Sequence, residues 1–136
     1  MKKKQTLVDN DCVTISLNEE KNLIETTWLR QPTSAEFRKY ISLIVAIAIE
    51  HKLPSLLFDI RKRNYIGFAD QNWLIDDIFP QLTGTLKKVA YLTEVESFKL
   101  FDTMRLQEVM ASNFESNSFL IDHFLDEKQA FDWLLS

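Results

Sequence analysis

Short apolar segments alternate with long helical segments along most of this chain, and this alternation limits the folds open to it. The apolar stretches 53–60, 88–92 and 118–124 are separated by segments whose length and capping residues indicate helices. Strands separated by helices pair in parallel through right-handed crossovers. Before them, residues 12–17 alternate apolar and polar side chains, and residues 23–29 are typical of the returning strand of a hairpin. The pattern therefore predicts an α/β fold: a single mixed sheet of about five strands, with an N-terminal β-hairpin and about four flanking helices.

The expected helices begin at recognisable capping residues. Thr33 and Glu36 have the spacing of a capping box, and the same spacing recurs from Thr93 to Glu96. Pro80 is expected to stop the second helix, because proline lacks the N–H that a helix interior needs. The four helices are expected over residues 33–52, 68–79, 93–112 and 126–135.

Length, charge and composition restrict the function classes. A chain of 136 residues fits one domain, which we place at residues 12–136 after an N-terminal tail at 1–11. The net charge of -4 argues against nucleic-acid binding, which needs a basic face. The apolar run 43–49 is far shorter than the ~20 residues that span a bilayer, so no membrane insertion is expected. The absence of an apolar leader after Met1 and the single Cys12 favour a cytoplasmic location.

The residues that usually carry chemistry are scattered. The only two glycines, Gly67 and Gly84, do not form the glycine-rich turn after a strand that phosphate and dinucleotide sites need. His51 and His123 do not stand at metal-ligand spacing, and the single cysteine is far from both. A Gly-x-Ser-x-Gly hydrolase motif is absent from the sequence. We therefore expect no catalytic residues, no metal and no cofactor.

The segment that follows the strand at 53–60 is the candidate interaction loop. It leaves a buried strand at its carboxyl end, the edge at which open α/β sheets place their sites. Its candidate residues are Asp59, Arg61, Arg63 and Tyr65. Asp59 is placed to accept from Arg61 or from loop amides, and Tyr65 to stack or to donate. The alternative is that Asp59 only ties down its own loop while the arginines face water.

The predicted helix at 33–52 carries more apolar surface than one contact face needs. One stripe is expected to face the sheet and consists of Phe37, Ile41, Ile44 and Ala48. Leu43, Ala46 and Ile47 fall on a different part of the helical wheel. Two interpretations are open: the next helix of the same chain covers this second stripe, or Leu43 and Ile47 form an association surface, as in a homodimer.

Several segments of the chain resemble a known protein family. The sequence Leu-Leu-Phe-Asp-Ile-Arg at 56–61, followed by a polar turn and then a helix, resembles small bacterial proteins of the STAS-like type. These are relatives of the anti-sigma-factor antagonists and of the cytoplasmic domains of sulfate transporters. The other segments that carry the resemblance are 71–73, 78–80, 87–91 and 126–135. The resemblance covers about residues 12–135, and it implies a mixed sheet with flanking helices and a role in protein–protein regulation.

The chain departs from that family at one functional position. The family's regulatory members are phosphorylated on a serine or threonine at the start of the helix after the strand equivalent to 56–60. Here no serine or threonine lies between Leu56 and Leu82, so the familiar phosphate switch is not available. We expect a non-enzymatic protein-interaction module that binds a protein partner or itself. The alternative is a small apolar-ligand or lipid-binding module, because the same broad fold group resembles lipid-binding domains and 12% of the residues are aromatic.

Overall fold

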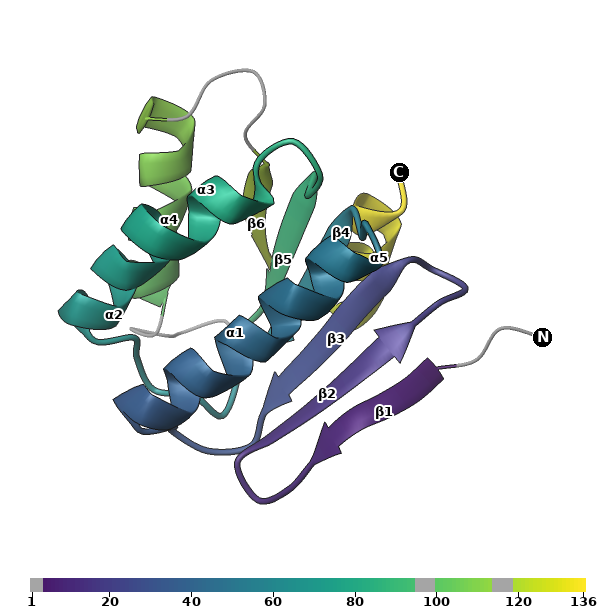
Figure 1. Cartoon of the computed structure of the whole chain (residues 1–136), viewed down its shortest axis with the longest axis horizontal. Coiled ribbons are helices and arrows are strands. Elements are labelled where there is room, and N and C mark those ends of the chain that lie inside the picture. Colours follow the sequence, from purple (N-terminus) through teal and green to yellow (C-terminus); the bar gives the residue numbers. More distant parts are fainter. Residues whose placement is uncertain (1–3, 95–99, 114–118) are drawn as a thin grey trace.

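The chain forms one mixed sheet with helices on both faces (Figure 1). The computed structural model describes residues 4–94, 100–113 and 119–136. Within these residues, six strands stand in the sheet in the order in which they occur along the chain. They are β1 (Lys4–Asp9), β2 (Val13–Asn18), β3 (Leu23–Trp28), β4 (Ser55–Asp59), β5 (Lys88–Leu92) and β6 (Leu120–Phe124). The first three pair antiparallel and the remaining junctions, from β3 to β6, are parallel.

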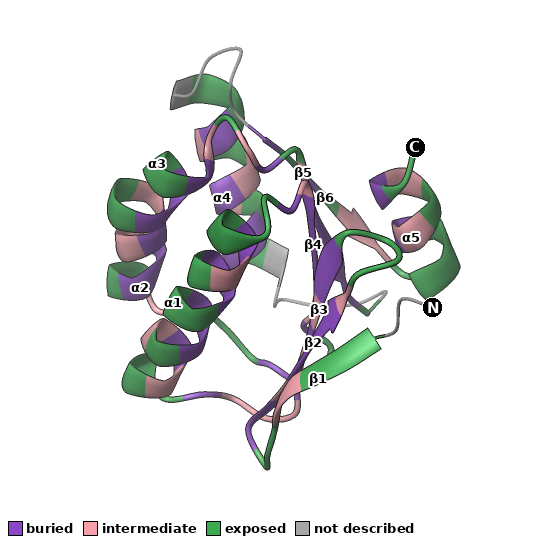
Figure 2. Ribbon diagram, turned by 45° about the vertical axis from the view of Figure 1, so that its right-hand side comes forward, coloured by how far each residue is buried: buried purple, intermediate pink, exposed green. Residues whose placement is uncertain are grey.

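The helices are divided unequally between the two faces of the sheet. They are α1 (Ser34–Glu50), α2 (Phe68–Trp73), the π-helical turn η1 (Leu74–Ile78), α3 (Phe79–Leu82), α4 (Leu100–Asn113) and α5 (Glu127–Leu134). Among the described segments, the first five pack on one face, which we call the inner face, and α5 alone packs on the other (Figure 2). All three parallel crossovers therefore run over the same face, which agrees with a strand order that never reverses.

Alternation along β4 shows how the sheet separates two cores. Leu56 and Phe58 point to the inner face and join the main core beneath α1, η1 and α3. Leu57 points the other way and joins a smaller cluster with Ala130 and Leu134 of α5. All three side chains are buried. The strand is thus apolar on both faces, as expected for a strand in the interior of a parallel sheet.

The predicted fold class is confirmed, with one more strand than expected. The segment 1–11 was predicted to be a tail, but residues Lys4–Asp9 form β1 and pair antiparallel with β2. Leu7 and Val8 pack against the main core, and the Lys4 ammonium lies 3.2 Å from the Glu25 carboxylate. A short edge strand with one half-buried apolar pair gives a weak sequence pattern, which explains the error.

The helix starts are partly confirmed. Thr33 caps α1 in a full capping box: its side chain accepts from the Glu36 amide, and the Glu36 carboxylate accepts from the Thr33 amide. Asp126 caps α5 by accepting from the Lys128 amide. The second capping box extends to Glu96 and lies partly outside the described residues.

Pro80 does not end the second helix as predicted. The helical segment continues through η1 to Leu82, with Pro80 in the first turn of α3. Just before the proline, the Phe79 amide donates to the Leu74 carbonyl, five residues back. A proline ring would clash with the carbonyl four residues before it in a regular α-helix. The wider π turn leaves room for the proline ring, so the chain changes its helix type and continues in the same direction.

Candidate functional site

The loop after β4 begins with a side-chain clamp. The Arg61 guanidinium donates to both carboxylate oxygens of Asp59, at 3.0 Å from Nε and 2.7 Å from Nη2, and the Arg61 amide also donates to Asp59 Oδ1. The hydrogen bonds that Arg61 donates to the Asp59 carboxylate raise the pKa of Arg61 above its ordinary value. Both residues therefore hold the first turn of the candidate interaction loop, as the sequence led us to expect for Asp59.

Arg63 does not face water with the rest of the loop. Its side chain is only 1% exposed, and its Nη2 donates to the two carboxylate oxygens of Asp102 on α4, at 3.2 and 3.4 Å. The Asp102 carboxylate also accepts from the Ile66 amide. The expectation that the arginines of this loop face water is therefore correct for Arg61 and wrong for Arg63. A counter-ion on α4 allows the second arginine to be buried.

A buried polar cluster continues from this ion pair. The His123 ring stacks on Tyr91, and its Nε2 lies 2.7 Å from Thr103 Oγ1 on α4. Burial lowers the pKa of His123, with the nearby carboxylates of Asp122 and Asp102 opposing, and burial raises the pKa of Tyr91 to about 12. Both rings are thus held in their uncharged forms at neutral pH. Asp122 lies next to His123 in the chain, but its carboxylate accepts from the His123 backbone amide.

Sequence reasoning missed this cluster. Asp102 and Thr103 begin the buried stripe of α4, which continues with Leu106 and Met110. A stripe that opens with two polar residues obscures the apolar periodicity by which a buried helix face is recognised. The signal that the sequence offers is that the apolar residues of segment 98–111 spread over both sides of the helical wheel, which indicates an unusual helix but does not single out Asp102 or Thr103.

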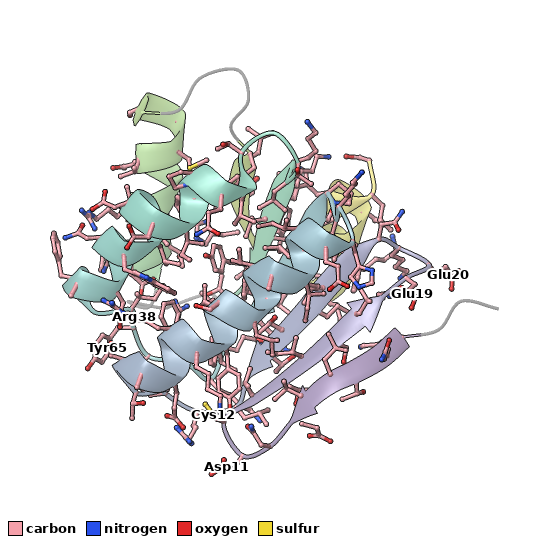
Figure 3. All side chains as sticks on the ribbon, viewed as in Figure 1. Asp11, Cys12, Glu19, Glu20, Arg38 and Tyr65 are labelled. Atoms are coloured by element: carbon pink, nitrogen blue, oxygen red, sulfur yellow. The ribbon has the colours of Figure 1, made fainter. Side chains whose placement is uncertain are left out.

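Tyr65 is presented at the outer end of the same loop (Figure 3). Gln31 fixes the backbone there, because its Oε1 accepts from the amides of Asn64 and Tyr65 and its Nε2 donates to the Tyr65 carbonyl. The Tyr65 side chain itself is 61% exposed. It borders an open cleft of about 220 Å³ between the loop and the first turn of α1, where Ser34 donates to the Asp70 carboxylate. The loop is therefore a firmly anchored platform for an exposed ring.

Further exposed apolar side chains lie at the same edge of the sheet. Phe68 begins α2 and is 66% exposed, and Phe101 lies in the first turn of α4 and is 68% exposed. Arg105 links the two helices, with its guanidinium 4.3 Å from the centre of the Phe68 ring. Met104, the residue before Arg105, is also exposed. We call Tyr65, Phe68, Phe101 and Met104 the edge surface.

The candidate association surface on α1 is divided by the structure. Ile47 is half-buried and packs against the main core. Leu43 is 37% exposed, and Ala46 between them in sequence is exposed. The chain therefore covers one residue of the second apolar stripe and leaves the other partly open. The association surface stays a prediction.

The residues considered for chemistry do not come together. Cys12 is buried beside β2, where burial raises its thiol pKa, and His51 is exposed at the end of α1. Among the residues that the structure describes, no three histidine, cysteine or carboxylate side chains gather in a way that could hold a metal ion. In the same part of the chain, none of the helices has both the length and the apolarity required to cross a bilayer.

A comparison with protein-family models, curated proteins and solved structures finds no match to this chain. The STAS-like resemblance therefore stays a prediction.

Proposed function

We propose that this chain is a non-enzymatic protein-interaction module of STAS-like type, and that it binds a partner protein through the edge surface. The observation that carries the proposal is the exposure of three aromatic rings, those of Tyr65, Phe68 and Phe101, at 61–68% each. Aromatic residues are enriched at protein interfaces and among the residues that dominate binding energy.

The magnitudes support a partner at this surface. An aromatic side chain buries 150–250 Å² when fully covered, so each ring leaves on the order of 100 Å² in water. At ~25 cal/mol per Å², covering the three rings would contribute about 8 kcal/mol before the costs of association. The platform is also rigid, because Gln31 and the Asp59–Arg61 clamp hold the loop that carries Tyr65. Little ordering is therefore needed on binding.

Capture of partner proteins from a lysate of the source organism tests this proposal. The wild-type chain and the Phe68→Ser/Phe101→Ser variant serve as baits, and bound proteins are identified by mass spectrometry. We expect at least one protein that binds the wild type and is lost with the variant. The matched control is Leu120→Ser/Leu135→Ser, which removes two exposed apolar side chains away from this edge and should retain that protein. A set of captured proteins that does not depend on Phe68 and Phe101 would contradict the proposal.

Self-association through α1 is tested separately. Leu43→Lys changes a partly exposed residue and should leave the fold intact, whereas Ile47→Lys places a charge against the main core and should destabilise it. Light scattering after size exclusion then gives the oligomeric state. If the wild type is a dimer and Leu43→Lys is a monomer, the association surface is supported. If the wild type is a monomer at high concentration, self-association through this surface is contradicted.

A further inference from the structure

An apolar cavity of about 40 Å³ lies in the main core, between the inner face of the sheet and the helices that cover it. Side chains of β3, β4, β5 and β6 form its floor, α1, η1 and α3 form its roof, and Arg63 and Ile66 of the loop after β4 also line it. Its walls are almost entirely hydrocarbon. The lining residues that carry polar side-chain atoms are Trp28, Arg63 and Tyr91.

Two N–H donors of the lining have no acceptor. Trp28 is fully buried and Arg63 nearly so, and neither Trp28 Nε1 nor Arg63 Nε has a hydrogen-bond partner within the described part of the chain. Buried donors are nearly always satisfied in folded proteins, because they lose their hydrogen bonds to water on burial. Both residues line the same cavity, so a molecule with an acceptor atom in that cavity would account for the two unpaired donors.

The charges around the cavity select the kind of acceptor. The positive charge of Arg63 is already balanced by Asp102, 3.2 Å away. The Tyr91 phenol and the His123 ring, which stack on each other, stay uncharged at neutral pH. A carboxylate or phosphate in this space would therefore add an unbalanced charge to an apolar interior, at high cost. A neutral carbonyl or hydroxyl oxygen accepts the same hydrogen bonds without that cost.

The roof contains the element best suited to adjust its width. Leu74 and Ile78, the first and last residues of η1, both line the cavity. A π turn holds one residue more than an α-helical turn, and such turns occur frequently at functional sites. The space of about 40 Å³ admits a few water-sized groups as it stands. A molecule of four or five heavy atoms is larger than this space, so its binding requires η1 to shift relative to the sheet.

We propose that this cavity binds a small uncharged molecule with one acceptor oxygen on a short apolar body, such as a ketone or an alcohol. Trp28 Nε1 and Arg63 Nε supply its hydrogen bonds, and the surrounding hydrocarbon covers the rest. The site is separate from the edge surface, and neither proposal depends on the other.

Proton–nitrogen correlation NMR of the full chain tests the site, because both donors give their own signals. Butanone is the probe. We expect its addition to shift the Trp28 indole N–H and the Arg63 Nε–H signals with saturation, while the indoles of Trp73 and Trp133, which do not line the cavity, stay in place. An alkene of the same shape, with a methylene group in place of the oxygen, and the butyrate anion should each bind at least tenfold more weakly.

A cavity-filling variant supplies the matched control. Val45 and Val89 both line the space, so Val45→Ile/Val89→Ile should keep the fold and abolish the saturable shifts. Val13→Ile adds a methyl group at a buried position outside the lining and should leave them unchanged. Unmoved donor signals, equal binding of the alkene, or stronger binding of butyrate would each overturn the proposal. None of these outcomes bears on the edge surface, which the capture experiment tests.

Discussion

Arg61 and Arg63 stand two residues apart in one loop, and the fold treats them in opposite ways. Arg61 lies at the surface, with its guanidinium nitrogen Nη2 2.7 Å from the Asp59 carboxylate. Arg63 turns inward, and its nitrogen lies 3.2 Å from the Asp102 carboxylate on a distant helix. The first pair is local, shorter and half exposed. The second is long-range, slightly longer and buried.

The difference means that the length of an ion pair does not indicate how much free energy of unfolding is lost when one partner is removed. A surface pair exchanges water for a counter-ion at nearly equal free energy, so its loss changes little. A buried pair hardly stabilises the fold relative to apolar residues, but removing one partner leaves a charge in a medium that cannot solvate it. Asp102 should therefore matter far more for stability than Asp59, although its contact is the longer one.

The largest effect is expected from Asp102→Ala. This change leaves the Arg63 cation buried without its counter-ion and the Ile66 amide without its acceptor. We expect a loss of about 3–5 kcal/mol in the free energy of unfolding, measured by urea denaturation. A loss below about 1 kcal/mol would mean that Arg63 moves readily to solvent. It would contradict the claim that the buried pair matters more for stability than the Asp59–Arg61 pair.

Replacing both buried partners should restore much of that loss. In Arg63→Met/Asp102→Leu both charges are gone and side chains of similar length fill the space. We expect this double variant to be more stable than Asp102→Ala by about 2 kcal/mol or more. Urea denaturation under the same conditions provides the measurement. A double variant that is less stable than Asp102→Ala would show that the ion pair itself carries stability.

A smaller effect on stability is expected from protonation of His123, the residue of the buried cluster that stacks on Tyr91. Because burial lowers its pKa in the folded chain, the unfolded chain takes up a proton first as the pH falls below about 6.5. Stability should therefore be fully present above that pH and should decrease below it, by at most about 1.4 kcal/mol per pH unit. Thermal unfolding followed across pH 7 to 5 should show this slope, and His123→Gln should flatten it. If the His123→Gln variant shows the same dependence of stability on pH, that dependence arises from other titrating groups.

The smallest effect is expected from Asp59→Ala. Its partner Arg61 stays in contact with water, so the loss in the free energy of unfolding should not exceed about 1 kcal/mol. Raising the salt concentration to 1 M should shrink that difference and leave the difference for Asp102→Ala nearly unchanged, because buried charges are screened little. If salt changes the stability losses of the two variants equally, both ion pairs are equally screened, which would contradict the burial of the Arg63–Asp102 pair.

Local patterns predicted most of the fold. The capping box at Thr33 and the apolar strand at 88–92 depend on neighbours in sequence, and both are as expected. β1 escaped prediction because an edge strand buries too little to leave a clear pattern. The extension past Pro80 escaped it because a π turn compensates for the proline.

The candidate site was less predictable than the fold. The position of the loop after β4 follows from topology, and Asp59 and Tyr65 follow from residue type. The burial of Arg63 does not, since it requires Asp102, 39 residues further along the chain. A contact of that kind is decided by tertiary packing, and single-sequence patterns carry no trace of it.

The uninterrupted strand order affects how the sheet grows during synthesis. Each strand lies beside the one made just before it, so the sheet can lengthen in step with the ribosome from β1 to β5. Arg63 emerges with β4, well before the helix that carries its anionic partner. A nascent chain that has just completed β5 therefore holds an arginine it cannot yet bury. Docking of α4, which follows β5 in the chain, brings the Asp102 carboxylate to Arg63 and so allows that arginine to be buried.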